Sequence, residues 1–232
     1  MPRIARHPVH MGRAQLLAAL MAAVERGGHH HHLSWNANKL AHVRTDPTFR
    51  ALADRADTLA ADGASIRWVA RAHGQPVPER IPGVELASEL LDRAAEHGWR
   101  VFLYGARPEV LATVVRRCRA QGVPVVGACD GFAHAPDAVA AFIERARPQL
   151  LLVALGTPRS ERFIDRWRPD AVCLGVGGTF DVLAGAVPRA PTWTHAVGLE
   201  GAYRVAMEPR KRWRVAWSGA RAVFDALAHP GP

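Results

Sequence analysis

Four short runs of consecutive apolar residues stand out in the second half of the chain, and each ends in glycine or a polar turn. They are VFLYG, VPVVGACDG, LLLVALG and AVCLGVGG, which begin at residues 101, 123, 150 and 171. The runs are continuous rather than alternating in polarity, which is typical of strands with two buried faces in a parallel sheet. We therefore predict four buried parallel strands in this half.

Helical stretches separate these runs and cover residues 108–120, 136–146 and 158–167. Each has proline at or near its first turn, where the fixed φ and missing N–H of proline are tolerated. The alternation of strand and helix predicts an α/β fold. We expect a Rossmann-like open, mostly parallel sheet with helices on both faces.

The N-terminal half is less regular, and its pattern predicts one short strand and four helices. The strand covers residues 32–35, and the helices cover residues 13–26, 38–52, 63–72 and 84–97. From about residue 199 the chain turns helical, basic and rich in tryptophan. We therefore expect an α/β core over residues 1–198 and a C-terminal basic helical appendage over residues 199–232.

The composition fits a folded protein with an anionic partner. Apolar residues make up 49% of the chain and charged residues 22%, which allows a hydrophobic core and argues against disorder. The net charge of +9 favours nucleic acid, an anionic membrane surface or a diphosphate ligand as partner. Cys118, Cys129 and Cys173 form neither a CxxC pair nor a zinc-binding spacing, so we expect buried thiols in a reducing compartment.

The C-terminal segment combines positive charge with a helical stripe of apolar residues. The stripe consists of Trp213, Trp217, Ala220, Phe224 and Leu227. Two interpretations stay open: a helix packed on the core with a solvated basic face, and an interfacial helix on anionic lipid. No apolar run is long enough to span a bilayer and no signal peptide is recognisable. We expect a cytoplasmic protein that associates peripherally with the inner face of the cell membrane.

Glycine-rich turns follow the predicted strands, at the edge where ligands of open parallel sheets bind. Glycine there lets backbone N–H groups approach a phosphate. The candidate nucleotide-binding residues are Gly105, Asp130, Gly156, Gly177, Gly178, Phe180 and Asp181. None of these turns has a Walker A or GxGxxG sequence. For the GVGGTFD segment, phosphate binding and a plain tight turn are therefore equal alternatives.

Several polar residues have ordinary interpretations when each is considered alone. Asp62 stands in an Asp-Gly pair typical of turns, Arg80 in a loop, and Ser34 and Asn36 where caps and turns are common. The four histidines at 29–32 favour a solvated segment before a strand over a metal site. We expect that segment to become charged below about pH 6.5.

Taken together, the segments resemble the WecG/TagA/CpsF family, which is glycosyltransferase family 26. The resemblance covers about residues 34–214 and keeps the family's order of motifs. The motifs are SWNANKL, ADGASIRWVAR, PERIPGVEL, VFLYGARPEV, DGF, LVALGTPRSE, GVGGTFDVLAGAVPRAP and GLEGAYRVAMEPRKRWR. Each motif alone is weak, whereas the full ordered set is specific.

The resemblance implies an inverting glycosyltransferase that needs neither a metal nor a cofactor. The absence of any Asp-x-Asp pair, with which many glycosyltransferases hold a divalent metal, agrees with this. The implied donor is a UDP-sugar and the implied acceptor an undecaprenyl-diphosphate-linked sugar, used to make teichoic acid, exopolysaccharide or another cell-surface polysaccharide. The sugar stays open among N-acetylmannosamine, its uronic acid, glucose and others, as does the formation of a homo-oligomer.

Site roles follow from the family's motifs. The resemblance assigns Asp62 as the catalytic base and Asp181 to the nucleotide. It implies these substrate-binding residues: Ser34, Asn36, Arg80, Ser160, Glu161, Arg204, Arg210 and Arg214. Two positions depart from the family: Ser160 replaces a glutamine, which affects donor choice, and Gly201 replaces a tryptophan, which affects docking of the appendage.

Two other functional classes compete with glycosyl transfer. A nicotinamide-dependent oxidoreductase needs an early GxGxxG followed by an acidic residue about 20 residues later, and neither is present. A nucleic-acid-binding protein would explain the net charge of +9. However, that charge is concentrated in the tryptophan-bearing tail and no nucleic-acid-binding module is recognisable, so we expect no nucleic-acid partner.

Overall fold

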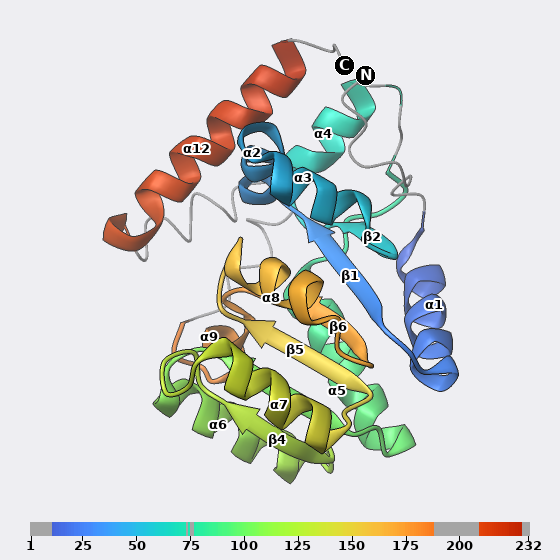
Figure 1. The fold of residues 1–232 in the computed structure, drawn as a ribbon. Helices are drawn as coiled ribbons and strands as arrows, with labels where there is room; N and C mark the ends of the chain where they lie inside the picture. Colours follow the sequence, from blue (N-terminus) through green and yellow to red (C-terminus); the bar gives the residue numbers. More distant parts are fainter. Residues whose placement is uncertain (1–10, 73, 75–76, 188–208, 229–232) are drawn as a thin grey trace.

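A computed structural model describes residues 11–72, 74, 77–187 and 209–228. Within these residues, six strands form one open sheet in the order β2-β1-β6-β5-β3-β4, and every neighbouring pair is parallel (Figure 1). The strands are β1 (His30–Trp35), β2 (Thr58–Ala61), β3 (Val101–Gly105), β4 (Val125–Cys129), β5 (Leu150–Ala154) and β6 (Val172–Gly175). This architecture confirms the α/β fold predicted from the apolar runs.

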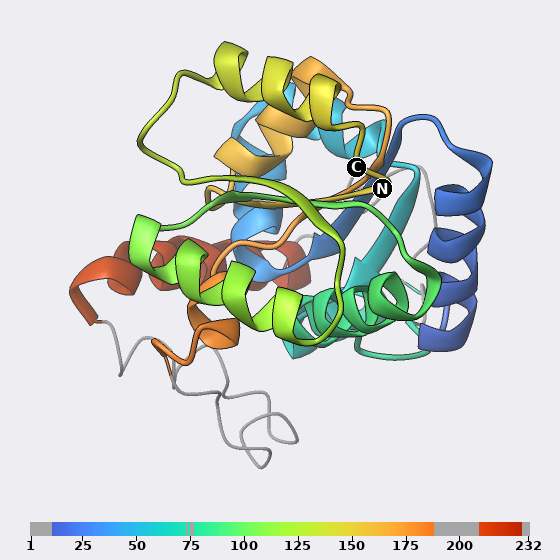
Figure 2. The ribbon, with the colours of Figure 1, turned by 90° about the horizontal axis from the view of Figure 1, so that it is seen from below.

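Helices cover both faces of the sheet, which gives three layers (Figure 2). On one face lie α1 (Arg13–Arg26), α5 (Gly83–His97), α6 (Pro108–Ala120) and α9 (Thr179–Leu183). On the other lie α2 (Ala37–Thr45), α3 (Pro47–Asp54), α4 (Ala64–Ala72), α7 (Pro136–Ala146) and α8 (Arg159–Trp167). Apolar residues of alternating strand positions pack beneath each layer, as expected for strands buried on both faces.

Two features of the N-terminal half differ from the prediction. The helix expected over residues 38–52 is two helices, because Pro47 begins α3 and the Asp46 carboxylate accepts hydrogen bonds from the backbone N–H groups of Thr48 and Phe49. Strand β2 was not anticipated, since its sequence TLAA is short and carries no clear alternation.

The expectation of a solvated histidine segment is wrong. His30, His31 and His32 belong to β1, which pairs with β2 on one side and β6 on the other, and all three side chains are buried. Burial lowers the pKa of each of these three imidazoles, by desolvation in every case. The strand therefore holds neutral histidines and does not become charged at pH 6.5.

The last described element is α12 (Pro209–Ala228), which lies across α2 and α4 (Figure 1). It packs through small residues: Ala222 and Ala226 join a core cluster, and Gly219 lies against Ala37. The expected helical appendage is thus present. Among the described residues, no helix is both long and apolar enough to span a membrane.

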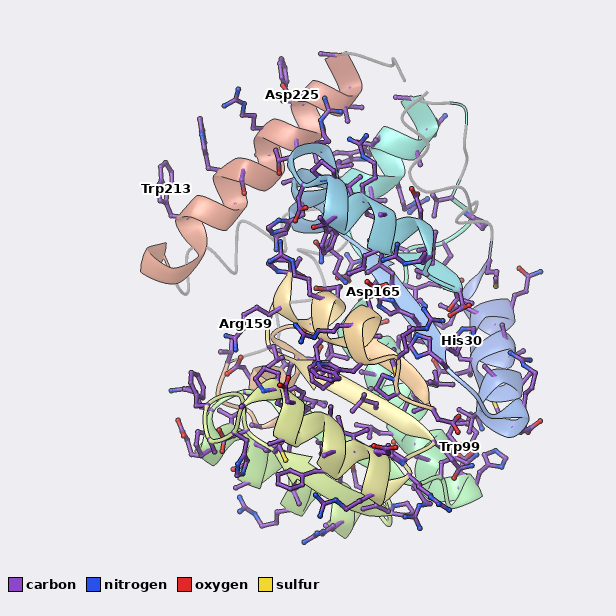
Figure 3. The ribbon with its side chains drawn as sticks, viewed as in Figure 1. His30, Trp99, Arg159, Asp165, Trp213 and Asp225 are labelled. Carbon is purple, nitrogen blue, oxygen red and sulfur yellow. The ribbon has the colours of Figure 1, made fainter. Side chains whose placement is uncertain are left out.

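The predicted apolar stripe of α12 does not face the core. Trp213, Trp217 and Phe224 are 61%, 65% and 70% exposed, and the two indole rings stack with centroids 5.9 Å apart. Figure 3 shows Trp213 projecting from α12 away from the sheet. At 100° per residue, these side chains lie roughly opposite Ala222 and Ala226. The helix therefore packs on the protein through its small residues and presents its aromatic residues to the outside.

Candidate active site

The carboxyl ends of β1 and β2 bring the first group of candidate residues together. Ser34 pairs with Ala60 in the parallel register, and the backbone N–H of Asp62 donates to the carbonyl of Trp35 over 2.8 Å. Two chain segments far apart in sequence are thereby fixed side by side. Ser34, Asn36 and Asp62 consequently lie at one edge of the sheet.

The start of α5 completes this cluster. The backbone N–H of Gly83 donates to Asp62 Oδ1 over 3.0 Å. A Cβ atom built on Gly83 would lie 3.7 Å from Ser34 Oγ and 3.9 Å from Asp62 Oδ2. The two oxygens therefore converge on the first residue of α5, where the helix dipole also stabilises a carboxylate. Gly83 was not among the residues predicted for the site, because its role depends on a contact with a residue 21 positions away.

Arg80 lies in the segment that precedes α5. The neighbouring Ile81 donates its backbone N–H to the carbonyl of Ala61 over 2.8 Å, which fixes this segment beside the end of β2. Arg80 is half-buried, and Asp62 directly follows Ala61. The backbone at Arg80 is therefore held next to the segment that carries the expected base.

Asn36 caps α2, since its side-chain oxygen accepts from the backbone N–H of Lys39 over 3.0 Å. The Asp-Gly turn packs against it, because a Cβ on Gly63 would lie 4.0 Å from Asn36 Cα. The ordinary interpretation as a cap is thus correct, and it holds Asn36 in a fixed position beside Asp62.

Ser160 and Glu161 lie under the site rather than at its surface. Ser160 Oγ donates to the carbonyl of Val153 and accepts from the N–H of Leu155, both over 3.0 Å. Glu161 Oε1 lies 3.0 Å from Lys39 Nζ, and both side chains are almost completely buried. Both side chains are thus turned into the protein, and their part in substrate binding, including the effect of Ser160 on donor choice, stays a prediction.

Burial opposes ionisation of Glu161, but the nearby ammonium of Lys39 outweighs it and lowers the pKa of this carboxyl. The ion pair connects the first turns of α2 and α8. Lys39 is a second residue that sequence analysis missed as a partner, because nothing in NANKL indicates that its ammonium is buried.

The candidate nucleotide-binding residues lie at or after the ends of β3, β4, β5 and β6, the four strands beyond β1 and β2 in the strand order. The chain leaves β3 toward β4 and leaves β5 toward β6, in opposite directions, so the turns at Gly105 and Gly156 flank a topological switch point. Gly105 has a φ of 109°, and a Cβ there would lie 2.5 Å from the carbonyl carbon of Ala154. Close packing of the two strand ends therefore requires glycine at this position.

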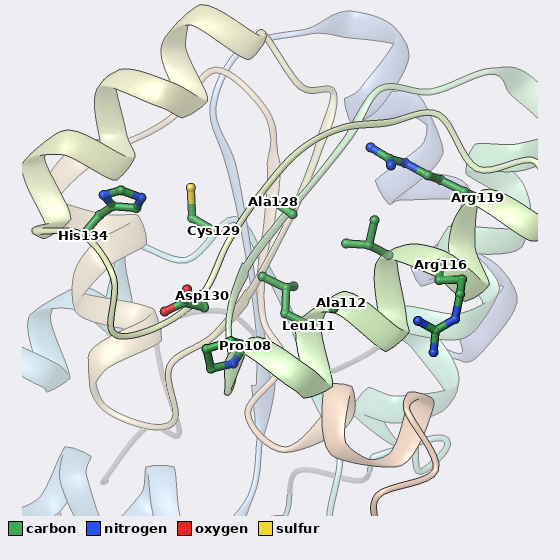
Figure 4. Close-up of a pocket in the computed structure, with 10 residues that line it drawn as sticks. Pro108, Leu111, Ala112, Arg116, Arg119, Ala128, Cys129, Asp130 and His134 are labelled. Atoms are coloured by element: carbon green, nitrogen blue, oxygen red, sulfur yellow. The ribbon is translucent and has the colours of Figure 1, made fainter.

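A cleft of about 520 Å³ opens beside β4 and α6 (Figure 4). Asp130 lines it together with Arg116, Arg119 and His134. The Asp130 carboxylate accepts from the backbone N–H groups of Phe132 and Ala133, each over 2.8 Å. Asp130 therefore stabilises its own turn at the end of this cleft.

The turn after β6 leads directly into α9. Gly177 has a φ of 53°, and Gly178 is the N-cap of the helix. Asp181 is partly exposed, with its Oδ1 3.9 Å from a guanidinium nitrogen of Arg107. Phe180 is fully buried in the core, so the geometry does not support nucleotide contact by its ring. The turn can still offer backbone N–H groups and the Asp181 carboxylate to a ligand.

The expected arginines of the appendage lie at or beyond the limits of the described residues. Arg204 lies outside them, as does Gly201, while the backbone of Arg210 and Arg214 belongs to the first two turns of α12. Within the described part of the chain, no three His, Cys, Asp or Glu side chains cluster so as to hold a metal ion.

Comparison of the sequence with known proteins identifies a family and a relative. A sequence model described as the glycosyl transferase WecG/TagA/CpsF family matches residues 3–229. The chain is also 36% identical over 189 residues to a protein of Bacillus spizizenii strain W23, covering 79% of this chain and 73% of the relative. That relative is named N-acetylglucosaminyldiphosphoundecaprenol N-acetyl-beta-D-mannosaminyltransferase.

Proposed function

Since the chain belongs to the WecG/TagA/CpsF family of glycosyltransferases, we propose that it moves a sugar from a UDP-sugar to a polyprenyl-diphosphate-linked sugar, with inversion and without a metal. The observation that carries this proposal is the convergence of Asp62 and Ser34 on the start of α5. The relative's name supports N-acetylmannosamine as the first donor sugar to test, with lipid-diphosphate-linked N-acetylglucosamine as acceptor.

In the proposed reaction, Asp62 removes the proton from the acceptor hydroxyl as this oxygen attacks the anomeric carbon. The new carbon–oxygen bond forms on the face opposite the bond to UDP, which breaks in the same step. One displacement of this kind inverts the configuration. The hydrogen bond from Gly83 to Asp62 Oδ1 supports this role, because it fixes the carboxylate.

The diphosphate of the leaving UDP gains negative charge as the bond breaks. We propose that Arg80 stabilises that charge, which the backbone contact of Ile81 beside Asp62 supports, and that backbone N–H groups at the glycine turns add to it. We assign the nucleotide to the turns after β3, β5 and β6, with Asp181 as the acceptor for uracil or ribose. Arg204, Arg210 and Arg214 are proposed to close over the diphosphate.

In this proposal, the aromatic residues exposed on α12 contact the membrane that holds the lipid-linked acceptor. Trp213 and Trp217 are exposed, and the sequence around them is basic, which is typical of helices that lie at the headgroup level of anionic membranes. We therefore propose that α12 holds the protein peripherally at an anionic membrane surface, where its acceptor resides.

The central test replaces Asp62 with asparagine, which keeps the shape of the side chain and removes the base. We expect kcat to fall by about 100-fold or more, while donor binding measured by calorimetry stays within about twofold. UDP release is measured with UDP-N-acetylmannosamine and a short-chain lipid-diphosphate N-acetylglucosamine. Asp92→Asn on the exposed side of α5 is the matched control and should keep wild-type turnover. Wild-type turnover in Asp62→Asn contradicts the assignment of the base.

A further inference from the structure

A row of hydrogen-bonded side chains runs along one face of the sheet, over β1 and β2, and ends at Ser34. His32 Nε2 lies 3.1 Å from Ser34 Oγ, and His32 Nδ1 lies 3.1 Å from Thr58 Oγ1. Thr58 Oγ1 in turn lies 3.1 Å from His30 Nε2. The three β1 residues alternate onto one face of the sheet, and Thr58 stands opposite His32 on β2. His30 lies near the start of β1 (Figure 3).

This row is sealed from water. His30, His32, Thr58 and Ser34 are 9%, 1%, 5% and 7% exposed, and apolar residues of α1 and α5 form the core on this side of the sheet. Desolvation lowers the pKa of both imidazoles, so each ring is neutral at pH 7 and carries one N–H and one acceptor nitrogen. A ring that accepts at Nδ1 must therefore donate at Nε2.

We propose that His32 and Thr58 are positioning residues that hold Ser34 Oγ and direct its proton toward the reaction centre at Asp62. Thr58 donates to His32 Nδ1, and His32 Nε2–H donates to Ser34 Oγ. The Ser34 proton then points away from the strand interior. This inference rests on the proposed function, in which Asp62 acts as base beside Ser34.

The direction in which the hydrogen bonds of this row donate follows from the negative charge of Asp62 at its end. Ser34 Oγ and Asp62 Oδ2 approach the same point beside Gly83. With His32 donating, a hydroxyl proton faces a carboxylate or an oxygen of the sugar. With the opposite direction, Ser34 would donate back into the strand and present only lone pairs to the negatively charged side chain. The first arrangement is electrostatically favoured.

Sequence position explains why only the structure shows this. His32 and Ser34 are two residues apart on one strand, but Thr58 comes from the neighbouring strand, 26 residues away from His32. The hydrogen bonds across the strands depend on the parallel register of His32 with Thr58. In this proposal His30 and His32, which are buried, support a site residue from inside the sheet.

The test uses Thr58→Val, which keeps the β-branched shape and removes the hydroxyl, with Thr58→Ser as the matched control. We expect Thr58→Val to lower kcat roughly fivefold to tenfold with little change in the KM of the donor, as for loss of one hydrogen bond. Thr58→Ser should restore most of the rate. In a Ser34→Ala background, Thr58→Val should cause no further loss, because Thr58 acts through Ser34.

A second measurement needs no variant. Nitrogen-15 NMR of the imidazole rings in the wild-type protein should show His32 as the Nε2–H tautomer. The Nδ1–H tautomer, or an equal loss of kcat from Thr58→Val with and without Ser34, overturns the inference. Activity in Asp62→Asn would instead refute the proposed base and would leave the tautomer and the double-mutant result unchanged, so the two failures are distinguishable.

Discussion

Lys39 Nζ and Glu161 Oε1 lie 3.0 Å apart inside the protein, with side chains only 3% and 1% exposed. A buried ion pair contributes little net stability compared with apolar residues, but the loss of one partner leaves an uncompensated charge. Here the pair joins the first turns of α2 and α8. The stability of the region behind Asn36 therefore depends on both charges together.

Removing one of these charges should destabilise the fold strongly. We expect Lys39→Met to lower the free energy of unfolding by about 3–5 kcal/mol, because Glu161 is left buried without its cation. Urea unfolding followed by circular dichroism measures the change. The matched control is Glu96→Gln, which removes the exposed ion pair with Arg93 and should cost less than about 0.5 kcal/mol. Equal effects of the two substitutions would contradict the burial of Lys39.

Acid should destabilise the protein through His31. Burial lowers the pKa of His31 to about 4, whereas the unfolded residue titrates near 6.5. Below about pH 6.5 the unfolded chain binds a proton at His31 that the folded chain does not. The contribution of His31 to the free energy of unfolding is therefore complete above pH 6.5 and is lost toward pH 4. Between pH 7.5 and pH 5 the loss amounts to about 2 kcal/mol.

The substitution His31→Leu removes the contribution of this histidine to the pH dependence of the free energy of unfolding. The decrease in the free energy of unfolding from pH 7.5 to pH 5 should be smaller than in the wild type by about 2 kcal/mol. Urea unfolding at both values checks it. An unchanged decrease in the variant would show that His31 is not the group responsible.

The aromatic face of α12 should govern attachment to lipid. We expect the double substitution Trp213→Ala and Trp217→Ala to weaken sedimentation with vesicles that contain anionic lipid by about tenfold or more, because two interfacial side chains are lost. Phe142→Ala on α7 is the matched control for an exposed aromatic residue and should bind like the wild type. If the double variant sediments normally, the proposed membrane face is wrong.

The contact of α12 with α2 at Gly219 should tolerate only a very small residue. A Cβ on Gly219 would lie 3.1 Å from Ala37 Cβ and 3.3 Å from its carbonyl carbon. We expect Gly219→Leu to displace α12 and lower the rate of transfer at least tenfold, since Ala37 directly follows Asn36. Ala228→Leu, on the exposed side of the same helix, is the control. Turnover at the wild-type rate in Gly219→Leu would show that the close contact of α12 with α2 is not needed for activity.

The apolar pattern predicted the second half of the fold because its strands are uninterrupted apolar runs that end in glycine or a polar turn. It missed β2, whose four residues include two alanines, and it joined α2 and α3 across Pro47. The histidines of β1 were misinterpreted because polarity alone suggested water. Their burial depends on β2 and β6, which pair with them from distant parts of the chain.

The candidate site divides in a similar way. The ordered motifs predicted Asp62, Ser34 and Arg80 as site residues. The parallel pairing of β1 with β2 gives a physical reason for the proximity of Ser34 and Asp62, and the Ile81–Ala61 hydrogen bond holds the backbone at Arg80 nearby. Motifs do not say where a side chain points. Glu161 and Phe180 turned out to be buried, and the contact between Gly83 and Asp62 depends on how α5 returns to the sheet.

The packing of α12 on α2 fixes the distance between the tryptophan-bearing face of α12 and the residues beside Asn36. On the proposed orientation, the tryptophan face rests on the lipid surface and the opposite face holds the residue next to Asn36, with one helix between them. That helix is about 10–12 Å across with its side chains. The reaction would then take place at a fixed height, so the enzyme would select a sugar close to its lipid anchor and pass over the ends of longer glycans.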